Sequence, residues 1–241
     1  MRSVLRSEWT KLYSYPWSIL GLNGAILTAP VALFLMGIAN KTNLQPDDVL
    51  FLCLHTLYFG QVATAVTAAG FWGQEYSRSC IRTTFLAVPT RMRVIAAKLI
   101  VLSISVIIAG IISALLSMAV GIFQFNGEIT FYLAVRYIGR VVLAMLSWVQ
   151  IALITSGLAV LTKSLVAPIA IMISLILGLS QLLLKFFKLA KYLPDLAAIN
   201  LFLTPGTATY LDTWSGLTVQ FAWLMLLGTA AVWVTMRRDV R

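Results

Sequence analysis

The sequence predicts an all-helical integral membrane protein with six transmembrane helices, an amino-terminal interfacial helix and a short cytoplasmic helix. Of its 241 residues, 60% are hydrophobic and only 11% are charged, and the mean hydropathy is +0.92. The apolar residues gather in six runs of about twenty residues or more, the length that an α-helix needs to cross a bilayer. We therefore expect residues 1–241 to form a single transmembrane domain, with no separate soluble domain.

The expected spans carry few polar side chains. They cover residues 17–39, 50–73, 99–123, 137–162, 165–184 and 216–236. Apart from Arg140 at one edge, none contains Asp, Glu, Lys or Arg. An ion inside the bilayer costs at least about 2.5 kcal/mol and is retained mainly for ion paths or proton relays. This pattern argues against a proton-coupled carrier.

Residues 1–16 are expected to form an amphipathic helix along the membrane surface. Leu5, Trp9 and Leu12 recur at helical spacing and predict its apolar face, with the charged residues elsewhere on the wheel. The residues that we assign to this interfacial helix are Arg6, Glu8, Trp9 and Lys11. The alternative is a solvated basic leader that only anchors the first span.

The distribution of basic residues predicts that both termini are cytoplasmic. Of the 18 Lys and Arg residues, six lie in outer connections and the remaining 12 in inner segments. The outer six are Lys41, Arg136, Arg140, Lys185, Lys188 and Lys191. Because the basic residues are split among short segments that flank apolar runs, they match lipid headgroups better than nucleic acid.

The longest outer segment covers residues 185–215 and is too apolar for an ordinary solvated loop. Pro194, Pro205 and Gly206 interrupt it, so one or two short helices are expected at the outer leaflet, with a re-entrant path as one option. Backbone of this kind is tolerated at membrane depth only where protein buries it or where it lines a cavity.

The sequence contains no recognisable catalytic or metal site. It has no HExxH or GxSxG motif and no pair of carboxylates on one span, and its single histidine, His55, excludes a His-based metal site. Asn23, Gln61 and Gln181 are polar residues within spans. They are expected to form hydrogen bonds between helices, and contact with a transported molecule is the alternative.

Residues 74–98 form a long polar segment between two strongly apolar ones. On a helix that starts at Glu75, one stripe is apolar and another is charged. The apolar stripe comprises Ile81, Phe85 and Val88, and the charged stripe comprises Glu75, Arg78 and Arg82. Pro89 ends this helix and Thr90 is placed to cap the next. The segment is either a docking surface for a cytoplasmic partner or a basic loop that only sets topology.

Motifs in this segment resemble those of a known family. They are Glu75-Tyr76, Ile81-Arg82-Thr83-Thr84, Val88-Pro89-Thr90-Arg91 and Ala96-Ala97-Lys98, supported by Leu5-Arg6-Ser7-Glu8-Trp9-Thr10-Lys11-Leu12 near the amino terminus. They are similar to the inner loop and the connecting helix of the membrane subunits of ABC type-2 exporters. The nearest likeness is to small six-span bacterial permeases associated with drug or antimicrobial-peptide efflux and self-immunity.

The resemblance implies that residues 74–90 form a coupling helix seated in a cleft of a separate ATPase subunit. Its contact residues would be Glu75, Tyr76, Arg78, Arg82, Pro89 and Arg91. Glu75 would pair either with a basic residue of the ATPase or with Arg78. This chain would bind no cofactor and hydrolyse nothing, because ATP and Mg²⁺ would bind the partner subunits.

The resemblance further implies a permease that pairs with a second copy or a paralogue in the bacterial plasma membrane. Its path would lie between the first, second and fifth spans, with Asn23, Gln61 and Gln181 as candidate contacts. The apolar spans suit a hydrophobic or amphipathic cargo, such as a drug, an antimicrobial peptide or a lipid-like molecule. The rival hypotheses are a stand-alone channel or secondary carrier, and a non-transporting sensor or assembly subunit.

Overall fold

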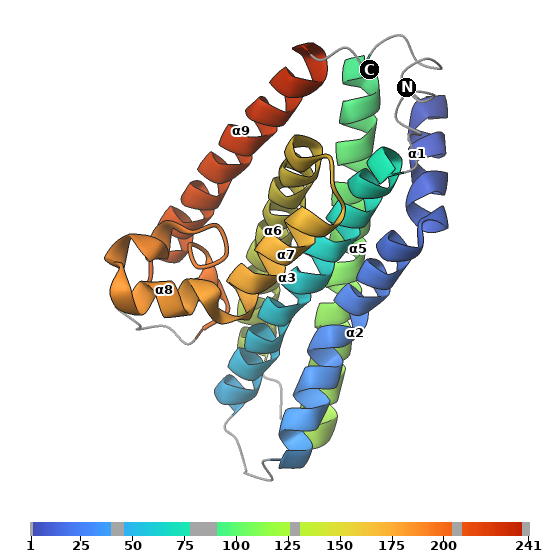
Figure 1. Ribbon diagram of the computed structural model, residues 1–241. Helices are drawn as coiled ribbons and strands as arrows, with labels where there is room; N and C mark the ends of the chain where they lie inside the picture. The colour runs from blue at the N-terminus through green and yellow to red at the C-terminus, as the bar shows by residue number, and fades with distance from the viewer. Residues whose placement is uncertain (1, 40–45, 78–90, 126–130, 204–208, 238–241) are drawn as a thin grey trace.

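Long helices dominate the architecture of the protein (Figure 1). The computed structural model describes residues 2–39, 46–77, 91–125, 131–203 and 209–237. The α-helices are α1 (Arg2–Ser14), α2 (Pro16–Ala39), α3 (Pro46–Ser77), α5 (Arg91–Phe125), α6 (Phe131–Thr162), α7 (Val166–Ser174), α8 (Ser180–Phe186) and α9 (Thr213–Arg237).

Within the described residues, six helical segments are long and apolar enough to cross a membrane, which confirms the predicted fold class of an all-helical integral membrane protein. They are Pro16–Ile38, Asp47–Tyr76, Met92–Phe125, Tyr132–Thr162, Val166–Phe186 and Thr213–Arg237. The first and last described residues, Arg2 and Arg237, lie at the same end of the bundle (Figure 1). We name this end the terminal end and the opposite one the far end.

Two helices are longer than expected at the terminal end. The second span continues to Ser77 as part of α3, instead of ending at Gly73. The third span, expected from Leu99, belongs to α5, which begins at Arg91, where the sequence predicted a helix to start after Thr90. The charges of Glu75 and Lys98 led us to make both spans too short at this end. Both charges are neutralised inside the bundle, so the helices continue through them.

The fifth span is broken, although the sequence had suggested one helix over residues 165–184. A π-helical turn, Leu175–Leu179, separates α7 from α8, and Gly178 within it has φ 138°, a conformation that favours glycine. The hydroxyl of Tyr58 in α3 donates to the carbonyl oxygen of Ile176 at 3.3 Å. Beyond this turn, α8 runs across the direction of α7 (Figure 1).

The connection from α8 to α9 contains two 3₁₀ helices, Lys188–Tyr192 and Ile199–Leu201. Residues 194–199 between them are buried against the bundle. The Gln220 side chain of α9 donates to the carbonyl of Pro194 at 2.7 Å. Gly216 permits this approach, because a Cβ atom there would overlap the backbone of Ala197. Residues 194–199 of the connection are therefore packed protein and not a solvated loop.

The core of the bundle lies around α3 and α6. The most apolar stretches of these two candidate spans are 67% and 61% buried, against 17% for the last span, which places α9 at the periphery. Trp148 of α6 is completely buried and lies against Gly60 of α3, where any larger residue would collide with the indole ring. This close packing fixes the centre around which the other helices are arranged.

Candidate functional site

Helix α1 packs a different face against the bundle from the one that we expected. Leu12 is completely buried and Glu8 is 1% exposed, whereas Trp9 is 38% exposed. We had predicted that Leu5, Trp9 and Leu12 share one apolar face, and the prediction is wrong for Trp9, which does not lie on the buried face with Leu12. Glu8 is tolerated on the inner face because it finds two cations there, which leaves Trp9 free to face outward.

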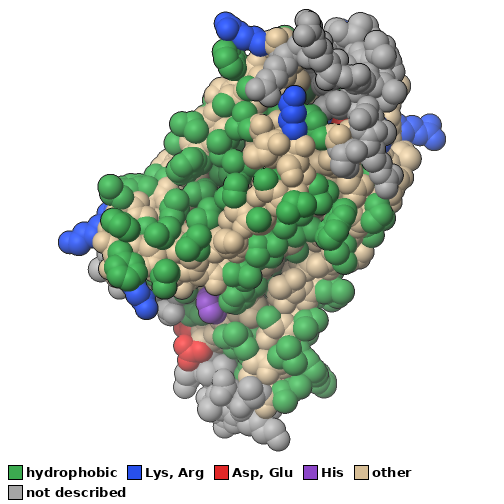
Figure 2. Space-filling model, in the orientation of Figure 1, with side chains coloured by type: hydrophobic (Ala, Val, Ile, Leu, Met, Phe, Trp, Pro, Cys, Tyr) green, Lys and Arg blue, Asp and Glu red, His purple; other side chains and the backbone are tan. Residues whose placement is uncertain are grey.

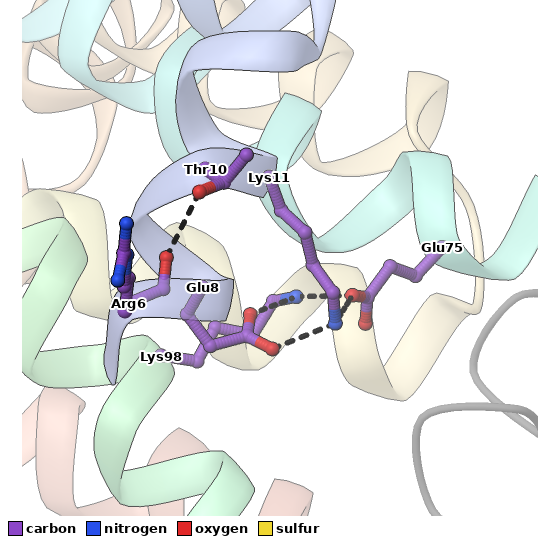
Figure 3. A network of polar contacts seen from close by, with 6 residues as sticks. All are labelled: Arg6, Glu8, Thr10, Lys11, Glu75 and Lys98. Atoms are coloured by element: carbon purple, nitrogen blue, oxygen red, sulfur yellow. Dashed lines mark hydrogen bonds and ion pairs between the residues drawn. The ribbon is translucent and has the colours of Figure 1, made fainter. Parts of the chain in front are cut away.

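Four charged side chains from three helices meet beneath α1 and form what we name the ion cluster (Figure 3). Its members are Glu8 and Lys11 from α1, Glu75 from α3 and Lys98 from α5. Lys11 Nζ lies 2.7 Å from Glu8 Oε1 and 2.9 Å from Glu75 Oε1. Lys98 Nζ lies 2.8 Å from Glu75 Oε1 and 3.3 Å from Glu8 Oε2. Each carboxylate thus contacts both ammonium groups.

The ion cluster is neutral overall and almost fully buried. The exposed fractions of Glu8, Glu75 and Lys98 are 1%, 2% and 1%, and only the Lys11 side chain, at 23%, reaches the surface. The Lys98 ammonium also lies 4.2 Å from the centre of the Phe71 ring. Two anions and two cations at these distances compensate for the loss of hydration, and removal of one would leave a buried charge unpaired.

Lys11 keeps its charge in this setting. Burial by itself lowers the pKa of an ammonium group, but the neighbouring carboxylates of Glu75 and Glu8 outweigh it and raise the pKa of Lys11 above its ordinary 10.5. Lys11 is therefore protonated at neutral pH.

The expected role of Glu75 as a surface contact needs correction. Its carboxylate points into the bundle and pairs with Lys98 and Lys11, neither of which we had assigned as a partner. Tyr76, the next residue, is partly buried. Arg78, Arg82 and Pro89 lie outside the described residues, and Arg91 is the first residue of α5.

Other assigned residues of α1 have simpler surroundings. Arg6 is exposed, and its carbonyl oxygen accepts a hydrogen bond of 3.0 Å from the Thr10 hydroxyl. Trp9 stacks at a tilt on Tyr13, with 5.5 Å between the ring centres. This outward-facing aromatic pair suits the membrane interface, where aromatic side chains gather.

The ion cluster joins α1 to the end of α3 and to the first part of α5. Glu75 lies two residues before the last residue of α3, and Lys98 lies seven residues after the first residue of α5. Sequence reasoning did not assign Lys98 to a site, although the spacing of Leu5, Glu8 and Leu12 was a signal that α1 buries a polar stripe.

The three polar residues that we proposed as cargo contacts do not line one enclosed path within this chain. Gln61 is completely buried and its amide donates to the Ser147 hydroxyl of α6 at 3.1 Å. Asn23 and Gln181 are exposed, and the Asn23 amide donates to Ile19 of its own helix. Gln61 therefore has the structural role of joining α3 to α6.

An apolar groove, which we name the α2/α3/α7 groove, lies between the first, second and fifth spans. Its volume is about 630 Å³. Its lining includes Leu20 and Met36 from α2, Val62 and Val66 from α3, and Ile169 and Ile173 from α7. A surface of this composition suits hydrocarbon and offers no fixed charge to an ion.

Comparison with protein-family models assigns the chain to a known family. The family model described as "ABC-2 family transporter protein" matches residues 4–181, which is more than half of the sequence. The chain belongs to this family. It is thus a multi-pass permease subunit of an ABC transporter. Membrane subunits of this family work with ABC ATPase partners and are not themselves ATPases. Comparison with curated proteins and with solved structures found no match.

Proposed function

We propose that this ABC-2 permease exports a hydrophobic or amphipathic molecule, and that residues 78–90 dock on a cytoplasmic ATPase. The observation that carries this proposal is the ion cluster, which ties both ends of the docking segment to α1. Because the three helices share one buried set of ions, a push on the segment moves them as one body. The permease thereby receives the motion that ATP binding produces in its partner.

The proposed orientation places the terminal end in the cytoplasm. The excess of Lys and Arg in segments at this end supports it. The plasma membrane of a bacterium is the proposed location, since the resemblance is to small bacterial permeases. A second copy or a paralogue completes the transporter and covers the α2/α3/α7 groove, so that the cargo passes between two such surfaces.

The docking assignment is tested by charge reversal at Arg82, which lies in the middle of the segment. The full-length permease is purified together with its candidate ATPase, which we expect to be encoded beside it. Arg82→Glu should abolish co-purification and stimulation of ATP hydrolysis, while membrane insertion stays unchanged. The matched control is Arg136→Glu, a charge reversal at the far end, which should retain both.

Normal ATPase binding by the Arg82→Glu variant would contradict the docking role. It would then favour a non-transporting membrane subunit or a carrier that needs no ATPase. Equal loss of binding in both variants would show a general effect of charge reversal on the fold, and the docking assignment would lose its support.

The proposed cargo surface is tested by filling the α2/α3/α7 groove. Val62→Trp places an indole ring in this groove, and we expect it to reduce cargo-stimulated ATP hydrolysis at least tenfold, with ATPase binding intact. A second groove of about 630 Å³, between α5, α6 and α9, supplies the control substitution Val232→Trp. The proposal fails if filling the second groove blocks stimulation and filling the first does not.

A further inference from the structure

A protruding surface at the side of the bundle, where α8 leaves the direction of α7, combines exposed hydrophobic residues with lysines (Figure 1). We name it the α8 surface, and it consists of Lys185, Phe186, Phe187, Lys188, Leu189 and Lys191. The exposed fractions of Phe186, Phe187 and Leu189 are 74%, 64% and 78%. Figure 2 shows basic side chains beside hydrophobic ones at the edge of the molecule where α8 lies. Such large apolar side chains are stable in this position if they enter hydrocarbon.

The three lysines of this surface have no acidic partner in the described part of the chain. The five ion pairs found there involve Lys11, Lys98 and Arg136 as cations, and none involves Lys185, Lys188 or Lys191. Three cations within seven residues therefore lack any counter-charge from the described protein. Their long side chains can extend from an apolar base toward a polar layer.

A count along α6 places the connection that follows α8 at the boundary between hydrocarbon and headgroups. About 20 helical residues cross the hydrocarbon core, so a count along α6 from Thr162 reaches Val142 at the opposite boundary. Arg140 lies one half-turn beyond, and its guanidinium donates to the carbonyl of Leu203 at 3.3 Å. Leu203 belongs to the connection that begins with the α8 surface. Lys185, Lys188 and Lys191 precede Leu203 in the chain, and their long side chains can extend to the headgroup level.

The α8 surface is held in place by the bundle. The Trp223 indole of α9 donates to the carbonyl of Tyr192 at 2.8 Å, and the Ser180 hydroxyl at the start of α8 donates to Asp195 at 2.7 Å. The break at Gly178 turns α8 across the bundle, so the surface faces outward. Lysines on a fixed support lose less freedom on binding than lysines on a flexible loop.

We propose that the α8 surface binds the headgroup phosphates of anionic phospholipids. Phe186, Phe187 and Leu189 enter the acyl region, while Lys185, Lys188 and Lys191 pair with phosphate groups above it. Attraction of a basic residue near a membrane surface corresponds to roughly fivefold in binding per lysine. This site is independent of the ATPase and of the cargo, and it makes residues 185–192 a lipid-binding element of the permease.

The test places a photo-crosslinking residue, p-benzoylphenylalanine, at Leu189 of the full-length protein. The protein is reconstituted into nanodiscs that hold phosphatidylcholine in excess over phosphatidylglycerol, and the cross-linked lipids are identified by mass spectrometry. We expect phosphatidylglycerol to be enriched at least about fivefold over its share of the bilayer. The same label at Leu115, an exposed position of α5 away from these lysines, should show no enrichment.

Two triple variants separate charge from structure. Substitution of Lys185, Lys188 and Lys191 by Gln should remove the enrichment at Leu189, and substitution of all three by Arg should retain it. Enrichment that survives the Gln variant, or that is equal at Leu115, would overturn the proposal. Cross-linking to a protein chain instead of lipid would also overturn it, as would loss of enrichment on addition of millimolar glycerol phosphate, which would indicate a soluble anion.

Discussion

The protein buries carboxylates in two regions, and their partners differ. At the terminal end, Glu75 contacts two ammonium groups at 2.8 and 2.9 Å. In the connection between α8 and α9, Asp195 is similarly buried, with 1% of its surface exposed, but it accepts a hydrogen bond of 2.7 Å from the neutral Ser180 hydroxyl. Its second oxygen, Oδ2, has no hydrogen-bond partner in the described part of the protein.

The difference shows two ways of placing an acid inside a membrane protein. The ion cluster stabilises charge with opposite charge, which demands that α1, α3 and α5 all be in place. Asp195 has no cationic partner among the described residues, so its burial favours the protonated acid and raises its pKa above the ordinary 3.8. The ion cluster joins helices through ion pairs, whereas the site of Asp195 favours the protonated form of its carboxyl group.

The largest effect is expected from removal of one cation at the terminal end. Lys98→Met leaves the carboxylates of Glu8 and Glu75 with Lys11 as the remaining cation of the cluster. A buried charge without a partner typically costs about 3–5 kcal/mol. We expect a loss of this size in the free energy of unfolding, measured by denaturant titration in detergent.

The matched double variant tests whether charge balance is the cause. Glu75→Gln combined with Lys98→Met removes one anion and one cation, and Glu8 and Lys11 remain as a pair. We expect it to recover more than half of the stability lost in Lys98→Met. An additive loss in the double variant would show that packing of the lysine stem, and not its charge, stabilises this end.

A smaller and pH-dependent effect is expected at Asp195. Because the folded state holds the proton more tightly than the unfolded state, the contribution of this group to stability is fully present below pH 3.8 and is lost as the pH rises through the raised pKa. The wild type should therefore lose about 1 kcal/mol relative to Asp195→Asn as the pH rises from about 4 to about 8. Thermal melting of both proteins in detergent across this range measures it.

A constant difference in melting temperature between Asp195→Asn and the wild type over the whole pH range would remove the contrast between Asp195 and the ion cluster. It would mean that Asp195 is ionised at its site like the carboxylates of the ion cluster. Asp195→Glu serves as the control that keeps the ionisable group, and its melting should retain a dependence on pH.

The smallest effect is expected for an exposed ion pair. Arg136 lies 3.7 Å from Asp47 near the far end, and the side chains are 41% and 57% exposed. Pairs of this kind contribute about 0–1 kcal/mol, because water and salt screen them. Arg136→Gln should therefore change the melting temperature little, and a loss comparable to that of Lys98→Met would show that burial does not govern these ion pairs.

The sequence was sufficient to predict the transmembrane spans, but it was insufficient to predict which charged residues are buried and which residues they contact. Apolar runs of membrane length determine helices almost by themselves, since the backbone must satisfy its hydrogen bonds internally. The location of a buried charge depends instead on which helices are neighbours. Glu75 and Lys98 pair with residues of other helices, which the sequence does not show as neighbours. Their charges therefore suggested the end of a span and, for Glu75, a surface role.

The broken fifth span was missed for a related reason. A glycine within an apolar run is common in membrane helices, and residues 165–184 contain no proline near Gly178 that would signal a break. The turn depends on distant partners, since the Tyr58 hydroxyl donates to the carbonyl oxygen of Ile176 and the Ser180 hydroxyl donates to Asp195. The residues on both sides of Asp195 in the sequence are mostly apolar, and this was the signal that residues 194–199 pack inside the protein.

The order in which the chain is synthesised gives the ion cluster a further consequence. Glu8 and Lys11 lie one turn apart on α1 and pair with each other as soon as that helix forms. Glu75 and Lys98 emerge later, each on a different helix, and they reach their partners only when the third span has been made. Docking of α1 through the ion cluster is therefore a late step of biogenesis, because it requires that α3 and α5 are already in place.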